Sequence, residues 1–188
     1  MKRSLSGILL LSLAVAPGFA TALFQGSLAT DNQVALFNIT ANAPEAIAIE
    51  TYSYSSGTVN ATPIPAGGFA PTAFLFDRAQ VGRDPTTGNC DVIYFQDTLQ
   101  PGTYTLALSA YNNTPADTSI ADGFVEDGDP DLTCVEARTS GSFCDLTTAL
   151  GTSRTGAYAI SITGVDSATQ LGVPEPGSIG SCFWQAAR

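Results

Sequence analysis

The fold class of this chain is decided by the stretch Leu99-Gln100-Pro101-Gly102-Thr103-Tyr104-Thr105-Leu106-Ala107-Leu108-Ser109. The Pro-Gly pair predicts a tight turn, because Pro presets φ at one turn position and Gly tolerates a positive φ at the next. Tyr104, Leu106 and Leu108 then alternate with small or polar residues, as in a strand half-buried against a core. Together with the preceding run Val92–Asp97, this stretch predicts an antiparallel hairpin.

The same alternation recurs elsewhere, most clearly at Tyr158, Ile160 and Ile162. Short β-branched or aromatic runs are separated by clusters of Gly, Pro, Asn and Asp, which is typical of an all-β sandwich or barrel. We therefore expect a single antiparallel β-sandwich. Its predicted strands are Gln33–Thr40, Ala46–Tyr54, Ala73–Asp77, Val92–Asp97, Gly102–Tyr111 and Gly156–Val165.

The beginning of the chain has the pattern of a secretory signal peptide. Lys2 and Arg3 precede an uncharged apolar run, and small residues follow at Ala20 and Ala22, the −3 and −1 positions of a cleavage site. The apolar run is short for a membrane span, which disfavours the alternative of an uncleaved anchor. Residues 1–22 are thus predicted to be removed by signal peptidase, which leaves residues 23–166 as one domain and an exported protein.

The remaining composition excludes several classes of function. After residue 22 the chain has 5 arginines against 17 acidic residues, a net charge of −12. Such a surface repels phosphate backbones, so nucleic acid is not an expected partner. The chain has no histidine, which removes the commonest general base and the commonest zinc ligand. No pair of acids is singled out for glycoside hydrolysis, so we expect no catalytic residues.

Several segments together resemble a family of uncharacterised bacterial extracellular domains, the DVUA-type family. The matching residues are 24–28, 31–37, 51–54, 67–77, 99–106, 111–113, 122–124 and 143–155. The family is similar to pre-peptidase C-terminal domains, and the resemblance implies a jelly-roll-like sandwich that binds or assists rather than catalyses. The chain departs from the family pattern at Ala70, where an Asp is usual, and between Asp77 and Asp84, where an acidic run is missing.

Cys134 and Cys144 both lie in or beside the matching segments, and they bracket a loop that contains Gly141. In an exported protein we expect them to form a disulfide, which would contribute roughly 2–3 kcal/mol by restricting the unfolded chain. The alternative is two separate thiols. Cys90 lacks the nearby cysteine that relatives tend to carry, and a bridge to Cys182 stays open.

Asp127, Asp129 and Asp131 alternate in an acidic loop and offer hard oxygen ligands of the kind that calcium prefers. The spacing does not match an EF-hand, and the alternative is a solvated acidic loop. Tyr52, Tyr54, Tyr111 and the pair Asn112–Asn113 suggest a sugar platform, but alternating aromatic residues in strands more often pack against neighbours.

Val173, Pro174, Glu175 and Pro176 resemble the Pro-Glu-Pro box of bacterial exosortase substrates, the PEP-CTERM proteins. The resemblance implies export, with an exosortase as a partner. Only 12 residues follow Pro176, and as a helix they reach about 18 Å, less than a hydrocarbon core of about 30 Å. Residues 167–188 are therefore predicted to be a linker and a truncated, disordered tail without a complete membrane anchor.

These observations predict a non-catalytic protein of the cell surface or the extracellular polysaccharide matrix, acting as a binding or structural module. One alternative is a calcium-stabilised module that binds carbohydrate or protein. A second alternative is a secreted polysaccharide hydrolase.

The predicted cleavage site can be tested directly. Because Ala20 and Ala22 place small residues at −3 and −1, we expect the exported protein to begin at Leu23. N-terminal sequencing of the secreted chain measures this. A sequence that starts at Met1 would show an uncleaved anchor instead.

Overall fold

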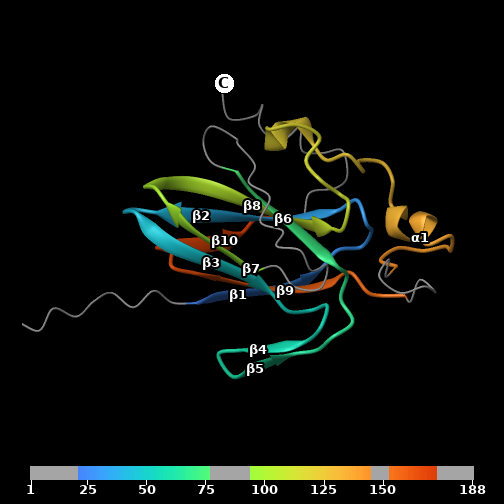
Figure 1. Ribbon diagram of the computed structural model, residues 1–188, viewed down its shortest axis with the longest axis horizontal. Coiled ribbons are helices and arrows are strands. Elements are labelled where there is room, and N and C mark those ends of the chain that lie inside the picture. Colours follow the sequence, from blue (N-terminus) through green and yellow to red (C-terminus); the bar gives the residue numbers. More distant parts are fainter. Residues whose placement is uncertain (1–20, 77–93, 145–152, 173–188) are drawn as a thin grey trace, which may run out of the picture.

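The strands form two stacked antiparallel sheets (Figure 1). The structure is a computed structural model that describes residues 21–76, 94–144 and 153–172. One sheet has the strand order β1-β9-β3-β7 and the other β10-β2-β8-β6. Their bounds are β1 (Ala22–Ser27), β2 (Val34–Ala41), β3 (Glu45–Thr51), β6 (Pro71–Phe76), β7 (Tyr94–Leu99), β8 (Gly102–Ala110), β9 (Ala157–Thr163) and β10 (Ser167–Gln170). The predicted all-β sandwich is confirmed.

The strand pairs are nested, as expected for a jelly-roll-like sandwich. β3 pairs with β7, β2 pairs with β8 and β1 pairs with β9, and every pair is antiparallel. The β3–β7 and β1–β9 pairs belong to one sheet, whereas the β2–β8 pair belongs to the other. Successive pairs of this nested series therefore lie in opposite sheets, as they do in jelly rolls.

The predicted hairpin between β7 and β8 is wrong. β7 pairs with β3, with Leu99 opposite Glu45, whereas β8 pairs with β2 and β6 in the other sheet. The Pro101-Gly102 turn therefore carries the chain from one sheet to the other. A tight turn sets the reversal of chain direction, but it does not choose the neighbour with which each strand forms hydrogen bonds.

The main core lies between the two sheets. Phe37 and Ile39 of β2 and Leu106 and Leu108 of β8 are fully buried from one side. From the other sheet Ile47, Ile49, Tyr158, Ile160 and Ile162 complete the same cluster. The rings of Phe37 and Tyr158 meet edge to face across the layers, with centroids 6.4 Å apart. The predicted inward faces of β8 and β9 are confirmed.

Both sheets are also covered in part on their outer faces. The 3-10 helix η1 (Ile120–Asp122) and Phe124 pack beside Phe74, Phe76 and Ala107 on one sheet. The hairpin of β4 (Gly57–Val59) and β5 (Thr62–Ile64) contributes Val59 and Ile64, which pack around Ala159 on the other. Strands β8 and β9 are therefore buried on both faces along part of their length, beyond the half-burial that their alternation predicts.

The sandwich extends beyond the predicted domain boundary at residue 166. β10 (Ser167–Gln170) pairs with β2, so these four residues belong to a sheet and not to a disordered tail. β1 and the short strands β4 and β5 were not predicted either. Residues 1–20, including Ala20, and the Val173–Pro176 motif lie outside the described residues, as do Cys90 and Cys182.

Candidate functional site

The predicted disulfide is present at one end of the sandwich. Cys134 lies in the short helix α1 (Leu132–Glu136), and its sulfur is bonded to that of Cys144, with Cα atoms 4.8 Å apart. Both cysteines are buried. The bridge closes a segment that projects beyond the strands, at the side of α1 in Figure 1.

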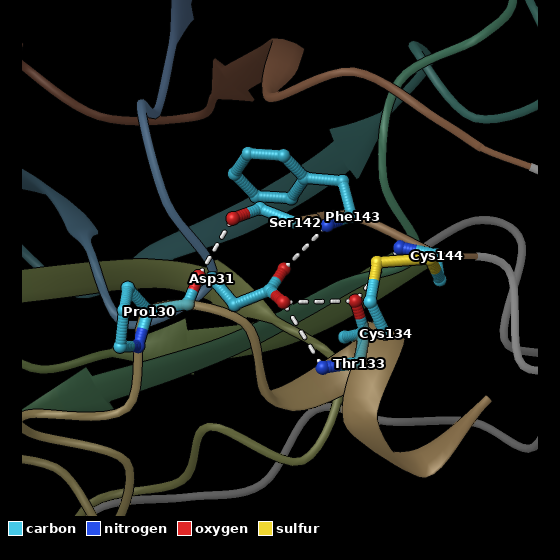
Figure 2. Close-up of a disulfide and its surroundings, with 7 residues drawn as sticks. All are labelled: Asp31, Pro130, Thr133, Cys134, Ser142, Phe143 and Cys144. Atoms are coloured by element: carbon cyan, nitrogen blue, oxygen red, sulfur yellow. Dashed lines mark hydrogen bonds between the residues drawn. A yellow bond between two sulfur atoms is a disulfide. The ribbon is translucent and has the colours of Figure 1, made fainter. Parts of the chain in front are cut away.

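A buried carboxylate, which sequence reasoning missed, holds this segment to the sandwich. Asp31 precedes β2 and is completely buried. Figure 2 shows its carboxylate between two parts of the disulfide loop. The Phe143 amide donates to one oxygen at 2.8 Å. The Thr133 amide and hydroxyl donate to the other at 3.0 and 2.9 Å. One side chain thus joins both halves of the loop to the core.

Asp31 takes the place of a local helix cap. Asp131 stands at the N-cap of α1 but makes no side-chain capping hydrogen bond. The exposed amides at the start of a helix need acceptors, and the Asp31 carboxylate supplies one for Thr133. The Thr133 hydroxyl in turn accepts from the Cys144 amide at 2.7 Å. The hydrogen bonds therefore continue from the core through α1 to the disulfide.

The backbone on both sides of Asp31 is anchored as well. The Asp31 amide donates to the Pro130 carbonyl at 3.1 Å. The Ser142 hydroxyl donates to the same carbonyl at 2.7 Å, as Figure 2 shows. Buried Asn113 donates to the Asp31 carbonyl at 3.5 Å. The loop is thus attached by several contacts with few rotatable groups, which favours a rigid surface.

Burial raises the pKa of the Asp31 carboxyl above its usual value of 3.8, and the nearby charge of Asp131 adds to the increase. The hydrogen bonds from Phe143 and Thr133 act in the opposite direction, because they stabilise the charged form. Burial outweighs these hydrogen bonds, so the pKa of Asp31 is raised.

One of the three alternating acidic residues of the loop makes a local contact. Asp127 accepts from the Phe124 amide at 3.2 Å and closes a local turn. Asp129 lies near Glu126, whose pKa is raised by burial and by the charges of Asp129 and Glu136. Within residues 21–76, 94–144 and 153–172, no three acidic or cysteine side chains are grouped so that they could hold a metal ion. Calcium at Asp127, Asp129 and Asp131 stays a prediction.

The tyrosines considered for a sugar platform differ in exposure. Tyr54 is buried beneath Arg154, whose guanidinium carbon lies 3.8 Å from the ring centroid. The Tyr52 hydroxyl donates to Glu50 at 2.8 Å. Asn113 is buried, whereas Tyr111 is exposed. Tyr54 therefore packs within the fold, and Asn113 is buried through hydrogen bonds to the Asp31 carbonyl and from the Glu126 amide.

A second buried carboxyl lies at the opposite end of the sandwich. Glu45 is the first residue of β3, and only 7% of it is exposed. Burial raises its pKa, and the carboxyl of Asp166 within hydrogen-bonding reach raises it further. The sequence carried a signal for this residue, because Glu45 is in phase with Ile47 and Ile49. The predicted strand began one residue later and so omitted it.

The fold and these sites define a class of protein: a disulfide-bonded, acidic, jelly-roll-like β-sandwich with a loop segment that a buried carboxylate attaches to the core. Neither a known family model nor a curated protein matches the chain. The part of the chain that the structure describes includes no helix with the length and apolar character needed to span a bilayer.

The hydrogen bonds of Asp31 predict that a single substitution at this position lowers the stability of the protein. Asp31→Asn replaces one accepting oxygen by an amino group, which faces N–H donors and leaves at least one of them unpaired. We expect the free energy of unfolding to fall by about 1–3 kcal/mol, measured by urea denaturation. The matched control is Asp131→Asn, which removes a charge from a side chain without a capping bond and should change stability by about 0.5 kcal/mol or less. Equal effects of the two variants would contradict a stabilising role for the hydrogen bonds of Asp31.

The raised pKa of Asp31 predicts that the stability of the folded protein depends on pH. The folded state holds the Asp31 proton more tightly than the unfolded chain does. Protonated Asp31 therefore makes its full contribution to the free energy of unfolding below pH 3.8, and this contribution is lost as pH rises through the pKa of the folded state. The stability difference between the wild type and Asp31→Asn should therefore shrink as pH rises from 3.8 and then level off. Urea denaturation of both proteins across this range measures it. A difference that grows with pH would show that the hydrogen bonds outweigh burial.

Proposed function

We propose that this protein is an exported, non-catalytic module of the bacterial cell surface or extracellular polysaccharide matrix. The observation that carries the proposal is the buried Cys134–Cys144 disulfide. Structural disulfides persist in oxidising compartments and are rare in the cytosol of mesophiles. The signal-peptide pattern of residues 1–22 supports the same location.

The architecture favours binding or structural support over catalysis. A rigid scaffold that presents a fixed loop is the usual arrangement for recognition in β-sandwiches. Here the Asp31 contacts and the disulfide hold the loop between Pro130 and Cys144. A chain without histidine lacks the commonest general base. The proposed partner is a polysaccharide of the matrix, whereas nucleic acid is disfavoured by the acidic composition.

Maturation follows from the two sequence signals. Signal peptidase would release the chain after Ala22, and the Val173–Pro176 motif would present it to an exosortase.

Fractionation of cells that express the native chain tests this proposal. We expect oxidised protein in the extracellular and matrix fractions, and co-sedimentation of the purified protein with matrix polysaccharide. A variant that lacks residues 173–188 is the matched comparison, and it measures whether these residues affect the distribution.

Three results would contradict the proposal. Protein recovered mainly in a carbonate-resistant membrane pellet, and released by removal of residues 173–188, would show that the tail is an anchor. Complete absence of retention by matrix polysaccharide would contradict the assignment to the matrix. Hydrolysis of a polysaccharide panel that is lost on changing single acidic residues would instead favour a secreted hydrolase.

A further inference from the structure

The Glu45 carboxyl occupies an unusual place in the sandwich. Its side chain is in phase with Ile47 and Ile49, both of which belong to the central core. Alternate residues of a strand share one face, so Glu45 lies on the inward face of β3, at the rim of the apolar layer. Its Oε2 is buried and has no hydrogen-bond partner. A buried acceptor without a partner is costly.

Asp166 acts on this carboxyl in two opposite ways: a hydrogen bond from its backbone lowers the pKa of Glu45, whereas its carboxyl raises it. The Asp166 carboxyl lies within hydrogen-bonding reach of Glu45. The position of Asp166 is fixed, because its amide donates to the Thr40 carbonyl at 3.1 Å and its Oδ2 accepts from the Asn42 amide at 2.6 Å. Two carboxylates at this separation repel each other unless a proton or a cation lies between them.

The described basic side chains do not supply that cation. Arg154 donates to the Tyr54 carbonyl at 3.0 Å, and Tyr54 follows the far end of β3. Arg138 follows α1, at the other end of the sandwich. Asp166 is exposed and lines a hollow of about 250 Å³ between the start of β1 and the turn into β10. A small ion can therefore reach the Asp166 carboxylate from solvent.

We propose that Glu45 and Asp166 form a calcium site at the end of the sandwich opposite the disulfide. Calcium accepts carboxylate oxygens together with backbone carbonyls and water in a flexible geometry. The unpartnered Glu45 oxygen and the exposed Asp166 carboxylate provide the two protein carboxylates, and water provides further ligands from the open side. Magnesium fits less well, because it requires a near-octahedral shell.

This site is separate from the acidic loop, because its two carboxylates come from other parts of the chain. Glu45 begins β3, and Asp166 lies in the turn from β9 to β10, so the ion would join two crossings between the sheets. The proposal does not depend on the ligand of the protein or on its place in the matrix. With two carboxylates, we expect an affinity in the range of extracellular modules, with a Kd of about 10⁻⁴–10⁻³ M.

Thermal unfolding of EDTA-treated protein tests the site. At pH 7.5 and constant ionic strength, 10 mM calcium should raise the Tm by about 3–8 °C, because the native state alone holds the ion. The same concentration of magnesium should give a smaller shift. Isothermal titration with calcium should show one site per chain.

Two variants remove the site while preserving the local hydrogen bonds. Glu45→Gln can donate from its amide to Asp166, so without calcium its Tm should be no lower than that of the wild type. Asp166→Asn keeps an oxygen to accept from the Asn42 amide. Both should lose the calcium-dependent shift. Asp129→Asn, in the acidic loop, is the matched control and should retain it.

Three results would overturn the proposal. The wild type could show no Tm shift at 10 mM calcium, which would assign a shared proton to the pair. The shift could persist in both Glu45→Gln and Asp166→Asn. It could also disappear in Asp129→Asn while persisting in Glu45→Gln, which would place calcium in the acidic loop. If Glu45→Gln does not fold, the comparison of Asp166→Asn with Asp129→Asn decides the question.

Discussion

Burial of one apolar layer between two sheets is the interaction on which the rest of this structure depends. Each strand from β1 to β3 and from β7 to β10 lies in the sheet opposite to that of its predecessor. No two successive strands of these series can therefore stabilise each other as a hairpin. Their burial depends on partners far away in the sequence, such as Phe37 of β2 and Tyr158 of β9. The sandwich is thus a cooperative unit in which both layers must form together.

The two ends of the sandwich differ in the length of their connections and in the surroundings of their buried carboxylates. At one end, short crossings bring Glu45, Gly102 and Asp166 to the rim of the core, and acidic groups meet there without a basic neighbour among the described residues. At the other end, the longer segment between β8 and β9 needs its own attachment, which Asp31 and the disulfide provide. Both ends place a carboxylate inside the protein, but only Asp31 is surrounded by donors. Burial of a carboxylate is tolerated when its hydrogen bonds are complete.

The sequence predicted the fold class because alternation in single strands is a local property. Leu106 and Leu108, or Ile160 and Ile162, identify an inward face without knowledge of any partner. Pairing is not local, which explains why the Pro101-Gly102 turn was taken for a hairpin. The disulfide was predictable from chemistry and resemblance, whereas Asp31 was not. A lone Asp before a strand resembles any loop acid until the fold brings it to Thr133 and Phe143, more than 100 residues further along the chain.

The pairing of β1 with β9 has a consequence for the order of events during the proposed export. β1 begins at Ala22, next to the predicted cleavage site, and its partner ends at Thr163. The first strand therefore cannot complete its sheet until almost the entire domain has been synthesised. Folds dominated by such distant pairings form slowly. A polypeptide that is threaded through a translocation channel must remain unfolded, and for a chain exported as proposed this topology would delay closure of the fold before translocation.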